Sequence, residues 1–188
     1  MLRTGVWTAR ANRPAVDREA AGARLASYAA DLLALAPGQG AQVVAAYAGV
    51  AEEPPTRPLL DALVAAGAHV LLPVVRSDDT GTLDWAAYEG WANLATARWG
   101  LLQPTAAPRG PEAIGAADLV VVPALAVDRA GHRLGRGRGF YDRALANVGR
   151  AKRVAVVYAD EIVDAVPHEP HDEPVGWVLS PDGLAKLG

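Results

Sequence analysis

Five short apolar runs, rich in valine, constrain the fold of this 188-residue chain more than any other feature. A strand that is buried on both faces is apolar along its whole length, whereas a strand with one solvated face alternates. Helical patterns lie between the runs, and this alternation predicts a single three-layer α/β/α domain over residues 1–188 with a mostly parallel central sheet. The expected strands are Gln42–Ala48, His69–Val75, Asp118–Leu125, Arg153–Ala159 and Gly176–Ser180.

The helices expected around these strands have apolar residues at helical spacing. The clearest covers Ala15–Leu35 and is ended by Pro37 and Gly38. A second helix begins at Leu59 and stops at Gly67, which is a common residue just after a helix. A third covers Tyr141–Val148.

Two segments have weaker patterns. Residues Arg76–Gly81 are polar and rich in turn formers, which predicts a surface loop. We expect Asp84–Thr96 to form a helix or an irregular cover, whose aromatic residues Trp85, Tyr88 and Trp91 face a partner or the core. Tryptophans of this kind can stack on a flat heterocycle, but buried core tryptophans are commoner.

Composition excludes several classes of function. The chain has no cysteine, so disulfides, thiolate metal sites and thiol catalysis are excluded. A formal net charge of -3 argues against nucleic acid as a partner. No apolar run reaches the length of a signal peptide core or a membrane span, so we expect no membrane partner and a cytoplasmic location. We expect a monomer that acts on small molecules.

The run GHRLGRGRGFYDR, Gly131–Arg143, combines glycines, arginines and an acidic residue. Glycine lets backbone N–H groups approach an anion, and the forked guanidinium groups of arginine suit phosphate oxygens. Asp142 can hold magnesium against the same phosphates. The run therefore predicts a phosphate site, although a flexible basic surface loop is the alternative.

The surroundings of this run favour the phosphate site. It lies between the expected strand Asp118–Leu125 and the expected helix Tyr141–Val148. In α/β proteins, nucleotides bind beyond the carboxyl ends of the strands, in loops that lead to helices. The chain contains neither a G-x-x-x-x-G-K-[ST] loop nor a G-x-G-x-x-G fingerprint, so the nucleotide hypothesis depends on this run alone.

Two further segments can contribute to the same site. Glu53 follows the first expected strand and can point into a cleft, while Thr56 is suited to capping the next helix; both roles are compatible. The segment His168–Glu173 contains His168, His171 and Asp172, but its prolines disfavour the helical spacing of many zinc or iron sites. We expect Asp172 to bind magnesium together with Asp142, or else to lie on a solvated loop.

The run RLGRGRGFYDR, Arg133–Arg143, resembles the R-L-G-x-G-x-G-[YF]-Y-D-R signature of the 5-formyltetrahydrofolate cyclo-ligases, also called methenyltetrahydrofolate synthetases. Tyr47, Glu53 and Thr56 are similar to the Y…E…T segment of that family, and Trp99–Pro104 to its W/F-G-I-x-[EQ]-P stretch. Residues 121–135 and 166–181 resemble the segment before the signature and the end of the family's chain.

The resemblance implies an enzyme that closes 5-formyltetrahydrofolate to 5,10-methenyltetrahydrofolate, with ATP and Mg²⁺ as cofactors and with release of ADP and phosphate. It implies a fold of the sugar-phosphate-isomerase and CoA-transferase type. Arg136, Arg138 and Asp142 are the implied catalytic residues, and Asp142 and Asp172 the implied metal ligands. Folate is expected at Glu53, Trp99 and Arg136–Phe140. ATP is expected at Arg3, Arg133, Leu134, Gly135, Arg136, Gly137, Arg138, Gly139, Phe140 and Tyr141.

The resemblance is weakest at the N-terminus. Family members usually have a lysine shortly before an arginine, both contacting ATP, and then another arginine. Arg3 and Arg10 fit the two arginines, but the sequence begins too late for the lysine. We therefore expect a start assigned too far downstream or weakened ATP binding. Two alternatives remain: a nucleotide- or folate-binding protein without catalysis, and an enzyme similar to phosphosugar isomerases or CoA-transferases.

Overall fold

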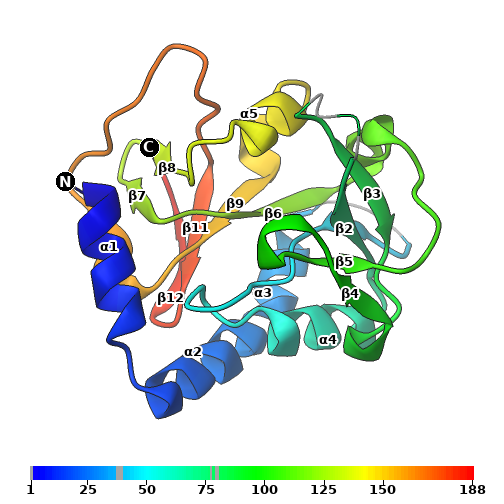
Figure 1. The fold of residues 1–188 in the computed structure, drawn as a ribbon, viewed down its shortest axis with the longest axis horizontal. Coiled ribbons are helices and arrows are strands. Elements are labelled where there is room, and N and C mark those ends of the chain that lie inside the picture. The colour runs from blue at the N-terminus through cyan, green and yellow to red at the C-terminus, as the bar shows by residue number, and fades with distance from the viewer. Residues whose placement is uncertain (1, 37–39, 77, 79–80) are drawn as a thin grey trace.

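A large central sheet organises the computed structural model, which describes residues 2–36, 40–76, 78 and 81–188 (Figure 1). The inner strands run parallel, and the two edge strands run antiparallel to their neighbours. This confirms the expected mostly parallel α/β sheet. Within the described residues seven strands pair in the order β12 (Gly183–Lys186), β11 (Trp177–Ser180), β9 (Arg153–Val156), β6 (Leu119–Pro123), β1 (Val43–Ala45), β2 (His69–Val75) and β3 (Leu83–Ala87).

Helices lie on both faces of the sheet (Figure 1). One face packs against α2 (Ala15–Ser27), α3 (Ala29–Ala34) and α4 (Arg57–Ala65), and the other against α5 (Phe140–Leu145) and the 3-10 helix η3 (Pro111–Ala116). Strand β6 explains why its sequence is apolar throughout. Leu119 and Val121 point into the first core, whereas Val120 and Val122 point into the second. A strand buried on both faces has no position for a solvated polar residue.

The long helix expected over Ala15–Leu35 is two helices. Tyr28 separates α2 from α3 with φ of -92° and ψ of 10°, and its N–H donates to the Leu25 carbonyl at 3.2 Å. The expected stop at Pro37 and Gly38 lies outside the described residues, as do residues 77, 79 and 80 of the expected loop Arg76–Gly81.

The expectation of a helix or irregular cover over Asp84–Thr96 is wrong. The segment contains edge strand β3, a 3-10 turn η1 (Trp91–Asn93) and β4 (Leu94–Thr96), which pairs antiparallel with β5 (Leu102–Pro104). Trp85 is fully buried in the second core, and Tyr88 is buried in the first. Packing against a neighbouring strand, rather than the helical spacing of its aromatic residues, determines the secondary structure of this segment.

A small three-stranded sheet contains the first part of the glycine-arginine run. It consists of β7 (Ala126–Asp128), β8 (Arg133–Leu134) and β10 (Ile162–Val163). The run therefore begins in the turn of the β7–β8 hairpin and includes β8, and it does not follow the buried strand directly, which corrects the simple strand-loop-helix expectation.

The N-terminal helix α1 (Leu2–Ala11) lies apart from α2–α4 (Figure 1). Among the described residues, no helix combines the length and apolar character that a membrane span requires.

Candidate active site

A cleft of about 480 Å³ lies where the parallel strands β1, β2 and β6 end. Its wall includes Tyr47 and Glu53 after β1, Val75 at the end of β2, and Leu125 after β6. Parallel α/β sheets bind ligands at this edge. The cleft also brings together every residue that the sequence predicted for ATP, folate or metal binding: Arg3, Glu53, Trp99, Arg133, Leu134, Gly135, Arg136, Gly137, Arg138, Gly139, Phe140, Tyr141, Asp142 and Asp172.

The glycine-arginine run forms one wall of the cleft and passes into α5. Gly137 and Gly139 have φ of 87° and 66°, a region that side chains rarely adopt, whereas Gly135 does not have positive φ. The Gly139 conformation directly precedes the first residue of α5. From α1, Arg3 Nε donates to the Gly135 carbonyl at 3.2 Å. Helix α1 therefore contacts the predicted phosphate loop directly.

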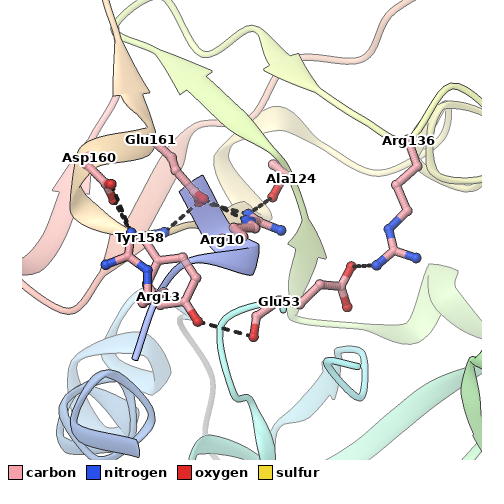
Figure 2. Close-up of polar contacts among 8 residues, drawn as sticks. All are labelled: Arg10, Arg13, Glu53, Ala124, Arg136, Tyr158, Asp160 and Glu161. Carbon is pink, nitrogen blue, oxygen red and sulfur yellow. Dashed lines mark hydrogen bonds and ion pairs between the residues drawn. The ribbon is translucent and has the colours of Figure 1, made fainter. Parts of the chain in front are cut away.

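Glu53 and Arg136 form an ion pair inside the cleft, with Arg136 Nη2 at 2.7 Å from Glu53 Oε1 (Figure 2). The Glu53 side chain is 7 % exposed and that of Arg136 is 35 % exposed. The Val50 N–H donates to Glu53 Oε2 at 3.0 Å, so the carboxylate is held from both sides. The expectation that Glu53 points into a cleft agrees with this geometry.

Thr56 has a different role from the expected one. It occupies the residue before α4, but its side chain makes no capping hydrogen bond. Its hydroxyl donates to the Tyr47 carbonyl at 2.8 Å and accepts the Gly49 N–H at 2.7 Å. Thr56 thus holds the backbone between β1 and Glu53 in place.

Two tyrosines near Glu53 are functional candidates that the site prediction missed or assigned differently. The hydroxyls of Tyr47 and Tyr141 are buried without a hydrogen-bond partner in the described structure. Burial, followed by the charge of Glu53, raises the pKa of both phenols well above its ordinary value. Both remain neutral donors, and buried donors of this kind ordinarily have a partner. In the sequence, only the similarity to the family's Y…E…T segment indicates Tyr47.

Arg133 and Asp142 form a second ion pair within the run. Burial lowers the pKa of Arg133, although the charge of Asp142 opposes this. The Glu173 N–H also donates to Asp142 Oδ1 at 3.3 Å, which joins the run to the segment that carries Asp172. The carboxylates of Asp142 and Asp172 therefore lie on neighbouring segments of one cleft wall.

The donor set at this wall fits a magnesium ion that arrives with a nucleotide. Mg²⁺ is commonly held by one or two carboxylates together with phosphate oxygens and water. In the described part of the chain, no group of three or more His, Cys, Asp and Glu residues is arranged to hold a metal. Asp142 and Asp172 suffice only if phosphates complete the coordination. His168 stacks on His132 with ring centroids 3.6 Å apart, and His171 is largely exposed.

Trp99 lies at the rim of the cleft and is 44 % exposed. Its φ of 60° and ψ of 23° are unusual for a residue with a side chain. The guanidinium of Arg138 lies 3.9 Å from the centroid of the indole, and the Phe140 ring is tilted against it at 6.1 Å. The guanidinium of Arg98 also lies over the ring, 4.8 Å from its centroid, so a planar ligand that stacks on the indole would replace one of these two guanidinium groups.

An α/β sheet with an arginine-rich cleft at the ends of its parallel strands defines a protein of the class that binds phosphorylated ligands. The comparisons narrow this class. The 5-formyltetrahydrofolate cyclo-ligase family matches residues 1–181, and the chain belongs to that family.

Characterised relatives agree with this assignment. The chain is 42% identical over 184 residues to the 5-formyltetrahydrofolate cyclo-ligase of Mycolicibacterium smegmatis, covering 96% of this chain and 92% of the relative. It is 34% identical over 143 residues to the Escherichia coli 5-formyltetrahydrofolate cyclo-ligase, covering 75% and 79% of the two chains. The solved structure of Aquifex aeolicus 5,10-methenyltetrahydrofolate synthetase has the same fold, with a TM-score of 0.71 at 24% identity over 99% of this chain and 91% of that one.

Proposed function

We propose that this protein catalyses the reaction for which its family is named, the ATP-dependent cyclisation of 5-formyltetrahydrofolate to 5,10-methenyltetrahydrofolate. The observation that carries the proposal is the convergence of all the predicted ATP, folate and metal residues on one cleft. These residues come from α1, the segment after β1, the segment before β5, the glycine-arginine run and the segment before β11. Family membership over residues 1–181 supports the same activity.

The chemistry requires activation of an amide. The oxygen of the formyl group on N5 is a poor leaving group, so N10 cannot displace it directly. Attack of this oxygen on the γ-phosphorus of ATP forms an O–P bond. The bond from the γ-phosphorus to the oxygen that bridges it to the β-phosphorus breaks, and ADP is released. N10 then attacks the activated formyl carbon, the C–O bond breaks, and phosphate departs with the former formyl oxygen. N10 loses its proton, and the five-membered ring is closed.

This reaction needs in-line placement of two substrates more than it needs a protein nucleophile. Arg136 and Arg138 carry fixed positive charge beside the phosphate loop, where charge on the transferring phosphoryl group is stabilised. Asp142 and Asp172 would hold Mg²⁺, which neutralises phosphate charge when it is bound. Arg3 lies at the other edge of the loop, within reach of the same phosphates.

The folate is assigned to the part of the cleft between Glu53 and Trp99. Glu53 is an acceptor that can hold the N–H groups of a pterin or position the amide, and its pairing with Arg136 joins this end to the phosphate loop. Trp99 is 44 % exposed at the rim, and its indole can stack on a planar ring that takes the place of a guanidinium group. The neutral hydroxyls of Tyr47 and Tyr141 supply donors that the described structure leaves unpaired.

The proposal is tested by mixing purified protein with 5-formyltetrahydrofolate, ATP and Mg²⁺ and recording the absorbance of the methenyl product. We expect product only when ATP is present. Substrate binding without product would favour a binding protein, and product without ATP would contradict the mechanism. Repeating the assay with an N-terminal extension that restores a lysine tests whether that position strengthens ATP binding.

A further inference from the structure

Arg10 forms a buried connection between helix α1 and the ends of two central strands. Its side chain is completely buried, and that of Glu161 is 4 % exposed. Arg10 Nε donates to Glu161 Oε1 at 2.6 Å, and Nη2 donates to Glu161 Oε2 at 2.7 Å. Nη2 also donates to the Ala124 carbonyl at 2.7 Å, just beyond β6 (Figure 2). A bidentate ion pair of this kind fixes the orientation of the guanidinium as well as its distance from the carboxylate.

The connection continues from Glu161 to the folate end of the cleft. Glu161 Oε2 accepts the Tyr158 N–H at 2.8 Å, and the Tyr158 hydroxyl donates to the Glu53 backbone carbonyl at 3.4 Å (Figure 2). Tyr158 follows β9, so the network spans the ends of β6 and β9 before it reaches Glu53. The backbone of Glu53 is held from this side while its carboxylate meets Arg136.

Arg10 also holds in place the helix that carries Arg3. Arg3 and Arg10 are seven residues apart on α1, which is about two helical turns, so the two side chains lie on the same face. Arg10 fixes the second half of the helix, and Arg3 in the first half reaches the Gly135 carbonyl at 3.2 Å. The position of Arg3 over the phosphate loop therefore depends on the docking of α1.

We propose that Arg10 is a positioning residue that acts through Arg3 on ATP and through Glu161 and Tyr158 on Glu53 and the folate. This inference rests on the proposed function, because it assigns the two ends of the cleft to those substrates. Arg10 itself touches neither the phosphate loop nor the Glu53 carboxylate. The charged pair is not needed for stability as such, since a buried ion pair can be replaced by apolar residues of similar volume without loss of stability.

The test uses the double variant Arg10→Met/Glu161→Met, which removes both charges together and leaves none unpaired. We expect a folded protein with a somewhat lower Tm, because the Tyr158 N–H and the Ala124 carbonyl lose their partners. Well below that Tm, kcat/KM should fall by about 10²-fold, the scale of a misplaced substrate. The loss should lie mainly in KM for ATP and for 5-formyltetrahydrofolate. Tyr158→Phe removes only the contact to Glu53 and should raise KM for the folate by about threefold, with KM for ATP unchanged.

A double-mutant cycle separates positioning from a structural effect. In an Arg3→Ala background, the double variant should cause little further rise in KM for ATP, because its effect on ATP passes through Arg3. Asp182→Asn is the matched control, since Asp182 forms an exposed pair with Arg24 and belongs to no contact of this network. It should leave both KM values unchanged.

Independent effects in the cycle, or a loss of activity that only follows a lowered Tm, would overturn the positioning role. Unchanged KM values in the double variant would overturn it as well. A wild-type protein that makes no methenyl product would instead contradict the proposed function. Calorimetric titration with a non-hydrolysable ATP analogue supplies a readout without turnover, and the double variant should bind this analogue more weakly.

Discussion

Arg136 from the glycine-arginine run and Glu53 from the segment after β1 meet in an ion pair of 2.7 Å across the cleft. The pair joins the predicted phosphate loop to the predicted folate end, although the two residues are 83 positions apart in the sequence. The Arg136 side chain is 35 % exposed but that of Glu53 is only 7 % exposed, so Arg136 neutralises a largely buried carboxylate. In the proposed mechanism the pair also aligns the two substrates.

Replacement of Arg136 by alanine should therefore remove turnover while leaving the fold intact. We expect Arg136→Ala to lower kcat by about 10²-fold or more, because a fixed charge at the transferring phosphoryl group is lost. Its Tm should fall moderately, because the largely buried Glu53 carboxylate keeps the Val50 N–H but loses its counter-charge. Stopped-flow or steady-state absorbance of the product, with a thermal melt of the same sample, checks both statements.

Glu53→Gln should weaken folate use more than ATP use. The amide can keep one contact of the carboxylate but loses its charge, and we expect KM for 5-formyltetrahydrofolate to rise by about tenfold. Glu52→Gln is the matched control, because the neighbouring side chain does not line the cleft. A larger effect from the control than from Glu53→Gln would count against the folate assignment.

Asp142→Asn should affect stability as well as activity. Loss of a metal ligand alone would abolish turnover with a nearly unchanged Tm. Asp142 is, however, the partner of Arg133, whose side chain is 5 % exposed, so the change leaves a buried guanidinium without its counter-charge. We expect a loss of about 1–3 kcal/mol in the free energy of unfolding. Asp172→Asn, measured beside it in urea, should lose turnover without this penalty.

Asp128 should make stability depend on acid pH. Its carboxylate accepts the N–H groups of Val166 and His132, at 3.0 and 2.9 Å. Burial alone would raise the pKa of Asp128, but these hydrogen bonds outweigh it, and the pKa is lowered. Its contribution is therefore complete above the unfolded pKa of about 4 and is lost as the pH falls through the folded pKa. Asp128→Asn should show a weaker pH dependence of urea unfolding in this range.

The backbone at Trp99 offers a separate test of the rim. With φ of 60°, glycine should be tolerated there better than alanine, by about 1 kcal/mol in the free energy of unfolding. Both Trp99→Gly and Trp99→Ala should raise KM for the folate, since both remove the indole. Equal stability of the two variants in chemical denaturation would show that the left-handed conformation carries no cost.

The strands could be predicted from the sequence because burial on both faces leaves an apolar run, as in Val120–Val122. Most of the predicted residues that line the cleft could be singled out because the glycine-arginine run has a specific pattern. The edge strand at Trp85 could not be predicted, since pairing with β2, and not the helix-like spacing of its aromatic residues, determines its conformation. The same holds for the Arg10–Glu161 pair, which joins residues 151 positions apart and has no local pattern.

The fate of the formyl oxygen tests the central claim most directly. 5-Formyltetrahydrofolate carrying ¹⁸O in the formyl group is incubated with the protein, ATP and Mg²⁺, and the released phosphate is analysed by mass spectrometry. Phosphorylation of the formyl oxygen predicts one ¹⁸O atom in each phosphate that accompanies methenyl product. Unlabelled phosphate, with the ¹⁸O recovered in water, would contradict the mechanism.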